Sequence, residues 1–144
     1  MRGADPPAAA EGPLLFAQVF RARPPAIRAV LLAVEGRLAP ISPDLANRVE
    51  LVLAELLNNI QRHGHRNRPA RVALRLFWQV PGLRAELIDD GGAIPADCLT
   101  APLPPPPRSL PENGFGWPLI HGLVSDLRYR RGEGYNVLGF RVPW

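Results

Sequence analysis

The feature that most constrains the fold of this chain is the segment from Pro43 to about Arg62, in which apolar residues recur with helical periodicity. Ser42 is a favourable N-cap, Pro43 suits the first helical position, and Gly64 marks the end of the segment. With about 100° of rotation per residue, one face of this helix is apolar along its length. That face consists of Leu45, Val49, Val52, Leu53, Leu56 and Ile60. We therefore predict a long amphipathic helix that packs on another layer of structure.

A stripe of three polar residues borders this apolar face. Glu55, Asn59 and His63 are spaced four residues apart and therefore follow one another along the same side of the helix. Polar groups aligned at the rim of a core are well placed to line a cleft. Asn58 is expected to point to water, so Asn59 is the better candidate of the two adjacent asparagines. For a lone Glu-x-x-x-Asn pair, a solvated helix edge would be the simpler interpretation.

The rest of the chain is predicted to supply the strands and two further helices. Alternating apolar residues on either side of Pro81-Gly82 indicate an antiparallel hairpin. The predicted strands are 14–21, 71–79, 83–89, 126–131 and 135–142, and the further helices lie between Pro24 and Pro40 and at 115–125. Helices interspersed with hairpin-linked strands favour a two-layer α/β sandwich, in which a mixed, mainly antiparallel sheet has helices on one face. Residues 1–13 are predicted to be a disordered tail, and residues 14–144 a single domain.

Composition excludes several classes of function. The chain has 144 residues and a net charge of +4, and all 17 basic residues are arginine. A P-loop nucleotide site is excluded, because it needs a lysine on the phosphates. The arginines are spread along the chain without a nucleic-acid-binding motif, so direct nucleic-acid binding is not expected. Cys98 is the only cysteine and no apolar run is long enough to cross a bilayer, so we expect a cytoplasmic protein without a disulfide or a membrane contact.

A second group of candidate residues follows the predicted strand 83–89. In the run Asp89–Ala93, two carboxylates precede two glycines. A carboxylate at a strand end can accept a hydrogen bond from a flat ligand, and glycines let that ligand approach the backbone closely. An ordinary Asp-Gly hairpin turn would lead straight into a returning strand. This chain instead enters a proline-rich loop that extends to Gly116.

A third group opens the helix predicted at 115–125. The run Asn113–Ile120 places Gly114 and Gly116 at its start. Free N–H groups at a helix N-terminus, preceded by a flexible backbone, suit phosphate binding. A plain loop-to-helix junction with Pro118 in the first turn is the alternative interpretation.

Taken together, the three groups resemble the sequence motifs of a known family. Glu-x-x-x-Asn-x-x-x-His on a long helix, Asp-x-Gly after a hairpin and Gly-x-Gly-x-x-Leu-Ile after a loop are similar to the N, G1 and G2 boxes of GHKL (histidine-kinase-like) ATPases, in the same order. The spacing and the chain length resemble those of stand-alone anti-sigma-factor serine kinases. The resemblance covers about residues 14–143 and implies the Bergerat fold, an α/β sandwich with ATP between the helices and under the loop.

The resemblance also implies a role for each residue of the first two motifs. Asn59 would bind Mg²⁺ through its side-chain oxygen, and Glu55 would be the general base for the substrate hydroxyl. Asp89 would accept a hydrogen bond from the adenine amino group, and Gly91 would leave room for the ring. His63 would either stabilise charge near the phosphates or have a structural role at the end of the helix.

The third motif implies a closing loop over the phosphates. Gly114, Phe115 and Gly116 would close over the nucleotide, and residues 97–113 would form the ATP lid.

Some positions depart from the family pattern. Ala93, which would still belong to the nucleotide site, replaces the second glycine of the G1 box, and its methyl group is expected to lower nucleotide affinity without removing the site. Tyr135 and Asn136 stand where the last strand of the family often begins with a threonine near the adenine. These departures bear on catalysis more than on nucleotide binding.

The function implied by the resemblance is that of an ATP- and Mg²⁺-dependent serine/threonine protein kinase. Its partners would be a STAS-type anti-anti-sigma protein that it phosphorylates, a sigma factor that it sequesters, or both, and a homodimer is compatible with this function. Two alternatives stay open. One is a catalytically weak nucleotide-binding regulatory scaffold, and the other is a detached histidine-kinase catalytic domain. The presence of Glu55 favours retained chemistry over the pure scaffold.

Overall fold

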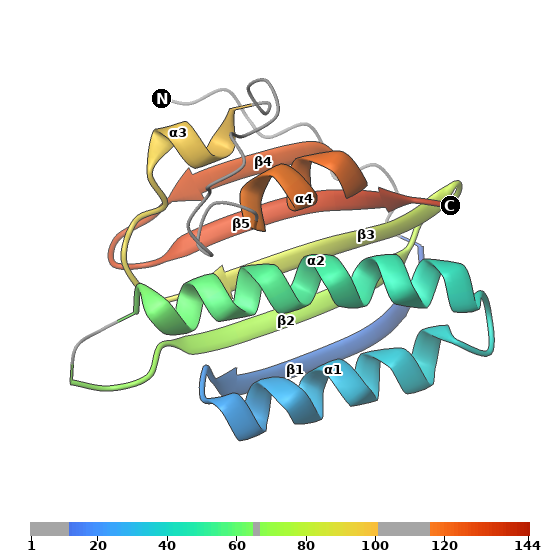
Figure 1. Ribbon diagram of the computed structural model, residues 1–144, viewed down its shortest axis with the longest axis horizontal. Helices are drawn as coiled ribbons and strands as arrows, with labels where there is room; N and C mark the ends of the chain where they lie inside the picture. Colours follow the sequence, from blue (N-terminus) through green and yellow to red (C-terminus); the bar gives the residue numbers. More distant parts are fainter. Residues whose placement is uncertain (1–11, 65–66, 101–115) are drawn as a thin grey trace, which may run out of the picture.

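A computed structural model describes residues 12–64, 67–100 and 116–144 of the chain (Figure 1). The described part forms a five-stranded sheet with the strand order β1-β2-β3-β5-β4. Its elements are, in chain order, β1 (Leu14–Arg21), α1 (Pro24–Leu38), α2 (Pro43–Arg62), β2 (Arg71–Trp78), β3 (Gly82–Asp89), α3 (Ala96–Leu99), α4 (Gly116–Leu123), β4 (Ser125–Arg131) and β5 (Asn136–Pro143).

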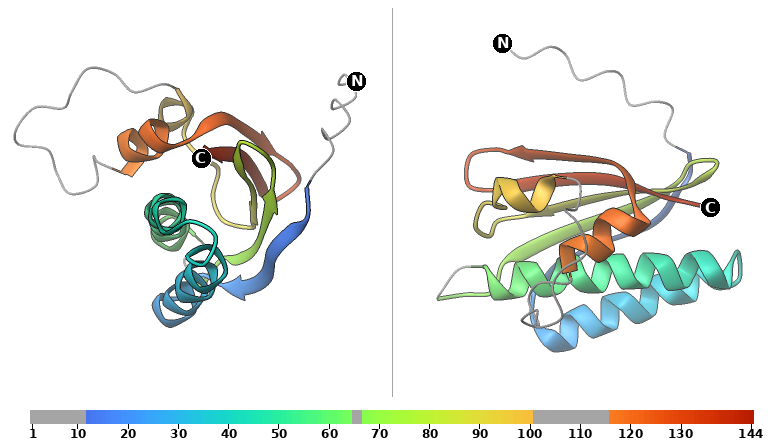
Figure 2. Two further views of the ribbon diagram at one scale, coloured as in Figure 1. Left: turned by 90° about the vertical axis from the view of Figure 1, so that its right-hand side faces the viewer. Right: turned by 45° about the horizontal axis from the view of Figure 1, so that its top comes forward.

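The helices α1, α2 and α4 cover one face of the sheet, and the left view of Figure 2 shows the sheet edge-on with these helices on one side of it. All four strand pairings of the described sheet are antiparallel. The α1–α2 hairpin explains the first of them, because two antiparallel helices after β1 return the chain to the sheet in the reverse direction. The predicted two-layer α/β sandwich with helices on one face is therefore confirmed.

Helix α2 has the bounds predicted from the sequence, because its signals are local. Ser42 caps the helix through Oγ, which accepts a hydrogen bond from the Leu45 backbone N–H at 3.2 Å. The predicted apolar face is buried, although Ile60 is only half-buried and Leu57 is fully buried as well. The buried arc is wider than predicted because α2 lies between α1 and α4 and also covers the sheet.

The core lies between the helices and the inner face of the sheet. Its strand residues alternate along β2, β3 and β5, so that every second side chain is buried against the helices. These residues are Val72, Leu74, Leu76, Leu83, Ala85, Leu87, Leu138, Phe140 and Val142. At one end of the same face, the register places two polar residues, Asp89 and Asn136, opposite each other.

The short helix α3 lies inside the region that the sequence predicts as a continuous loop. It has four residues, which is too few to give a periodic pattern. None of the helices in the described part of the chain combines the length and the apolar character that a membrane span requires.

Candidate functional site

A pocket lies between α2, α4 and the adjacent ends of β3 and β5. It contains residues from all three of the groups singled out in the sequence: Asn59 and His63 of the first, Asp89, Gly91 and Ala93 of the second, and Trp117 of the third. Its other lining residues are Leu56, Ile60, Leu87, Gly92, Ile94, Pro95, Asn136 and Leu138. The fold therefore brings together residues that are far apart in the sequence, and it places apolar side chains among a few polar ones, as is typical of ligand pockets.

Asp89 is the main acceptor in this pocket. It is the last residue of β3 and is 5% exposed. Its Oδ1 accepts hydrogen bonds from the Gly91 backbone N–H at 2.8 Å and from Asn136 Nδ2 at 3.1 Å. Burial raises the pKa of Asp89 above its ordinary value, and the two hydrogen bonds oppose that rise. No described residue donates to Oδ2, so this oxygen can accept a hydrogen bond from a ligand in the pocket.

Asn136 fixes the position of Asp89 from the neighbouring strand. Its Nδ2 donates to Asp89 Oδ1 and, at 2.8 Å, to the Gly92 carbonyl. Its Oδ1 accepts from the Tyr129 hydroxyl at 2.5 Å and from Arg131 Nη1 at 3.0 Å. Both donors and both acceptor positions of the amide are thus in use, so its orientation is set by the network.

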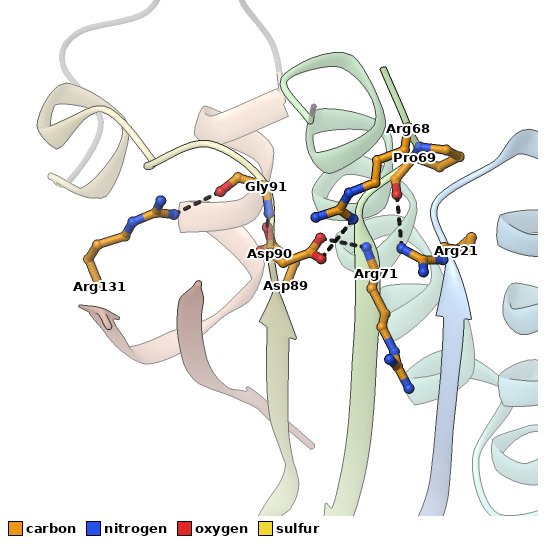
Figure 3. Close-up of polar contacts among 8 residues, drawn as sticks. All are labelled: Arg21, Arg68, Pro69, Arg71, Asp89, Asp90, Gly91 and Arg131. Carbon is orange, nitrogen blue, oxygen red and sulfur yellow. Dashed lines mark hydrogen bonds and ion pairs between the residues drawn. The ribbon is translucent and has the colours of Figure 1, made fainter. Parts of the chain in front are cut away.

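The same network holds the loop that follows Asp89. Arg131 Nη1 also donates to the Gly91 carbonyl at 2.8 Å, and the Tyr129 hydroxyl accepts from the Ile94 backbone N–H at 3.1 Å (Figure 3 shows the Arg131 contact). Both side chains come from β4. Sequence reasoning missed Tyr129 and Arg131 altogether and noted Asn136 only as a departure, because their roles depend on the pairing of β4 with β5.

The adjacent carboxylate, Asp90, does not line the pocket and points toward Arg68 and Arg71 (Figure 3). Its Oδ1 accepts from the Arg71 backbone N–H at 2.7 Å, and its Oδ2 pairs with Arg68 Nη1 at 2.9 Å. Two neighbouring acids therefore have different roles. Asp89 is available to a ligand, whereas Asp90 fastens the turn to the start of β2.

Gly91 lies where a side chain would crowd Asp89. A Cβ at this position would be 2.9 Å from Asp89 Oδ1 and 3.5 Å from the Gly64 Cα. Its backbone N–H is also the donor to Asp89. The glycine therefore lets the loop fold closely around the carboxylate, and room for a flat ligand at this point stays a prediction.

His63 lies at the C-terminal end of α2, where it is the C-cap residue. Its backbone carbonyl accepts from the Gly92 N–H at 3.3 Å, and its exposed side chain lines the pocket. His63 thus has a structural role through its backbone, which ends α2 and binds the loop after β3. A role of the ring near phosphates stays a prediction.

Glu55 and Asn59 both lie against the start of α4. A Cβ at Gly116 would be 2.9 Å from Glu55 Oε2 and 3.7 Å from Asn59 Nδ2. The first and third predicted groups therefore meet at Gly116. Asn58 is exposed, as the helical geometry predicted.

Asn59 carries a buried polar atom without a partner. Among the described residues, nothing forms a hydrogen bond with its Nδ2. A buried amide in this state is costly unless a ligand satisfies it, and rotation about the last side-chain bond exchanges its nitrogen and oxygen. The side-chain oxygen of Asn59 and the nearby carboxylate of Glu55 are hard oxygen ligands, which are the type that Mg²⁺ prefers. No group of three or more His, Cys, Asp or Glu side chains in the described ranges could hold a metal ion alone, so Mg²⁺ here would need ligands from phosphates and water.

The predicted ATP lid is described only at its start. Gly114, Phe115 and residues 101–113 lie outside the described residues. On the described side, α3 covers residues 96–99, and the Cys98 carbonyl is 2.8 Å from His121 Nε2 on α4. This contact joins the two elements that flank the predicted lid. Trp117, which follows Gly116, lines the pocket.

Comparison with known proteins agrees with this arrangement. A family model described as the histidine kinase-like ATPase domain matches residues 20–142. The chain is 26% identical over 117 residues to the serine-protein kinase RsbW of Bacillus cereus (strain Q1), covering 78% of this chain and 72% of the relative. The RsbW of Bacillus anthracis (strain A0248) matches to the same extent.

Among solved structures, the nucleotide-free catalytic domain of the histidine kinase ThkA has the same fold. Its TM-score is 0.51 at 16% identity, and the alignment covers 89% of this chain and 95% of that one. The family model spans most of the chain and includes Asn59, Asp89 and Gly116. The chain therefore belongs to the family of histidine kinase-like ATPase domains.

Proposed function

We propose that this protein binds ATP with Mg²⁺ in the pocket beside Asp89 and transfers the γ-phosphoryl group to a serine or threonine of a partner protein. The observation that carries the proposal is the convergence of three sequence motifs on one site. Asp89 offers an acceptor at one end of the pocket, and Glu55 and Asn59 meet Gly116 at the start of α4.

Asp89 supplies the specificity for adenine in this proposal. Its Oδ2 would accept a hydrogen bond from the exocyclic amino group, whereas guanine presents a carbonyl oxygen at the same position. The apolar side chains of Leu87, Leu138 and Ile94 would cover the ring. The network of Asn136 holds the carboxylate in place before the ligand arrives, which lowers the entropy cost of binding.

Glu55 supplies the base. As the substrate oxygen forms its bond to the γ-phosphorus, the bond from that phosphorus to the β,γ-bridging oxygen breaks and ADP leaves. The hydroxyl proton passes to the Glu55 carboxylate. Mg²⁺, held by the Asn59 oxygen and the phosphates, would neutralise charge on the transferred group. Glu55 and Asn59 lie one helical turn apart, so each can reach the phosphates from the same side of α2.

The similarity to RsbW supports the choice of partner. We propose a cytoplasmic regulator whose phosphoacceptor is a STAS-type anti-anti-sigma protein and which also binds a sigma factor. A homodimer is compatible with this proposal.

The test is phosphoryl transfer from radiolabelled ATP to a purified STAS-type partner. Glu55→Gln should bind ATP normally and lose about 10²–10⁴-fold in single-turnover rate, because the general base is gone. Glu50→Gln is the matched control, since Glu50 lies on the same helix away from the pocket. Acid-stable phosphoserine or phosphothreonine is expected. Acid-labile phosphohistidine would establish a histidine kinase instead, and partner binding without transfer would establish a scaffold.

A further inference from the structure

The third sequence motif contains an aromatic residue to which the proposed function gives no role. Trp117 follows Gly116 at the start of α4 and, among the described residues, is the one that this helix contributes to the lining of the pocket. Helix α4 lies beside α2 on the helix-covered face of the sheet (Figure 1). Trp117 therefore reaches the pocket from the helix layer, whereas Asp89 and Asn136 reach it from the strands.

The indole of Trp117 is only partly used in the core. The residue is half-buried and packs against the hydrophobic core. A tryptophan side chain has a large apolar surface, so a half-buried one leaves a considerable part of that surface uncovered. Because Trp117 also lines the pocket, uncovered indole surface is available to a ligand there.

A second aromatic ring restrains the orientation of this indole. The ring centroids of Trp117 and His121 lie 6.0 Å apart, one turn along α4, with 42° between the ring planes. His121 Nε2 lies 2.8 Å from the Cys98 carbonyl, which can only accept, so this nitrogen donates to α3. An aromatic side chain that is restrained before the ligand arrives loses little conformational entropy on binding.

The sheet contributes an apolar floor to the same pocket. Leu87 and Leu138 lie directly opposite each other on β3 and β5, and both line the pocket. A flat ring system with its edge at Asp89 would lie between this floor and the helix layer that carries Trp117. Such a ring would bury apolar surface on both of its faces.

The edge and the face of a nucleotide base carry different information. Adenine and cytosine both have an exocyclic amino group, so a hydrogen bond to Asp89 favours both of them and does not separate one from the other. The face does separate them, because a purine has two fused rings and a pyrimidine has one. An aromatic side chain that stacks on the base therefore gains more contact with adenine than with cytosine.

We propose that Trp117 stacks on the base of the bound nucleotide and thereby selects a purine over a pyrimidine. This inference rests on the proposed function, because its ligand is the nucleotide that Asp89 binds. Two residues then share the recognition of adenine: Asp89 reads the edge of the base, and Trp117 reads its face. The alternative is a role of Trp117 in core packing alone, which predicts a loss of stability without a change in nucleotide preference.

Calorimetric titrations with ATP and with CTP, each in the presence of Mg²⁺, test this role. The wild type should bind ATP more tightly than CTP. Trp117→Leu keeps an apolar side chain but removes the aromatic face, so its ATP affinity should fall about five- to a hundredfold, the range expected when one stacked aromatic side chain is lost. Its CTP affinity should fall less, so the ratio of the two affinities decreases. Trp117→Phe, which keeps a smaller ring, should give an intermediate ratio.

Trp144→Leu is the matched control for the loss of an indole. Trp144 stacks edge-on with Trp78 and follows Pro143, which pairs with Gly82 at the start of β3, whereas Asp89 is the last residue of that strand. The control therefore removes an indole from the other end of the sheet. Its affinities for ATP and CTP should stay within about twofold of wild type, as expected for a partly exposed side chain distant from the site.

Tryptophan emission gives a second readout that a role in core packing would not produce. Saturating MgATP should change the emission of the wild type and of Trp144→Phe but not that of Trp117→Phe, because Trp78 and Trp144 lie at the other end of the sheet. Urea denaturation of the same samples checks folding. If Trp117→Leu does not fold, Trp117→Phe takes its place in the titrations, with a smaller fall in the affinity ratio.

Two results would overturn this inference and leave the proposed function intact. Unchanged ATP affinity in Trp117→Leu would show that the indole does not contact the base. An equal fractional loss of ATP and CTP affinity, together with a lower urea midpoint, would assign Trp117 to the core alone. A wild type that binds neither nucleotide would instead contradict the proposed function, and this inference with it.

Discussion

Asp89 and Asn136 lie directly opposite each other on β3 and β5, and Asn136 Nδ2 donates to Asp89 Oδ1 at 3.1 Å. This single pair joins the candidate ligand acceptor to the hydrogen-bond network of β4 and the loop after β3. The donors of this network in the described residues go to Oδ1, so Oδ2 is the oxygen of this pocket-lining residue that stays available to a ligand. All hydrogen-bonding positions of the Asn136 amide are in use, so this residue makes the site rigid before a ligand binds.

Asn136→Ala tests the importance of this pair. The change removes the acceptor of Tyr129 and Arg131, the donor to Asp89 Oδ1 and the donor to the Gly92 carbonyl, so several polar groups lose a hydrogen bond. We expect a loss of about 1–3 kcal/mol in the free energy of unfolding, measured by urea denaturation. ATP affinity measured on the folded variant should also fall, because Asp89 is no longer held. Asn58→Ala, at an exposed position on α2, is the control and should change neither quantity. An Asn136→Ala protein as stable as wild type would show that the network is not structural.

The pH dependence of stability reports the burial of Asp89. Burial raises its pKa in the folded state above the unfolded value of 3.8, so the folded protein binds this proton more tightly than the unfolded chain does. The contribution of Asp89 is therefore fully present below pH 3.8 and is lost as the pH rises through the raised pKa. Asp89→Asn keeps a neutral acceptor at this position. We expect its stability relative to wild type to rise as the pH increases from about 4 to 7, measured by urea denaturation at each pH. A constant difference over that range would contradict a raised pKa.

Gly116→Ala tests whether the close approach of Glu55 to the start of α4 matters for phosphoryl transfer. The added Cβ would lie 2.9 Å from Glu55 Oε2, the end of a flexible side chain, so Glu55 should move while the fold is kept. We expect at least a tenfold loss of phosphoryl transfer, since displacing a general base removes part of its contribution. Gly122→Ala on the same helix is the matched control, because a Cβ there meets nothing within 4 Å. It should keep full activity. Equal activity of the two variants would show that Glu55 does not take part in phosphoryl transfer.

The sequence predicts the fold well where the signals are local. Helix α2 has the predicted bounds because Ser42, Pro43 and the apolar period all lie within the helix itself. The end of β3 at Asp89 is likewise marked by the glycines that follow. Helix α3 is not predicted, because four residues between prolines carry no period.

The residues that support Asp89 could not be found in the same way. Asn136 is 47 positions away from Asp89, and only the pairing of β3 with β5 brings the two together. Tyr129 and Arg131 reach the loop because β4 is the edge strand beside β5. Such contacts depend on the register of strands that are distant in sequence, which no local pattern specifies. Motif residues could therefore be named in advance, but their supporting network could not.

Calorimetric titration of the purified protein with ATP and Mg²⁺ tests the central claim most directly. We expect the wild type to bind MgATP, and Asp89→Asn to bind it about ten- to a hundredfold more weakly, because a hydrogen bond to a charged acceptor is lost and the amide can present a donor instead. GTP should bind the wild type more weakly than ATP by a similar factor. No heat with ATP, or equal affinity of the wild type and Asp89→Asn, would contradict an ATP site at Asp89.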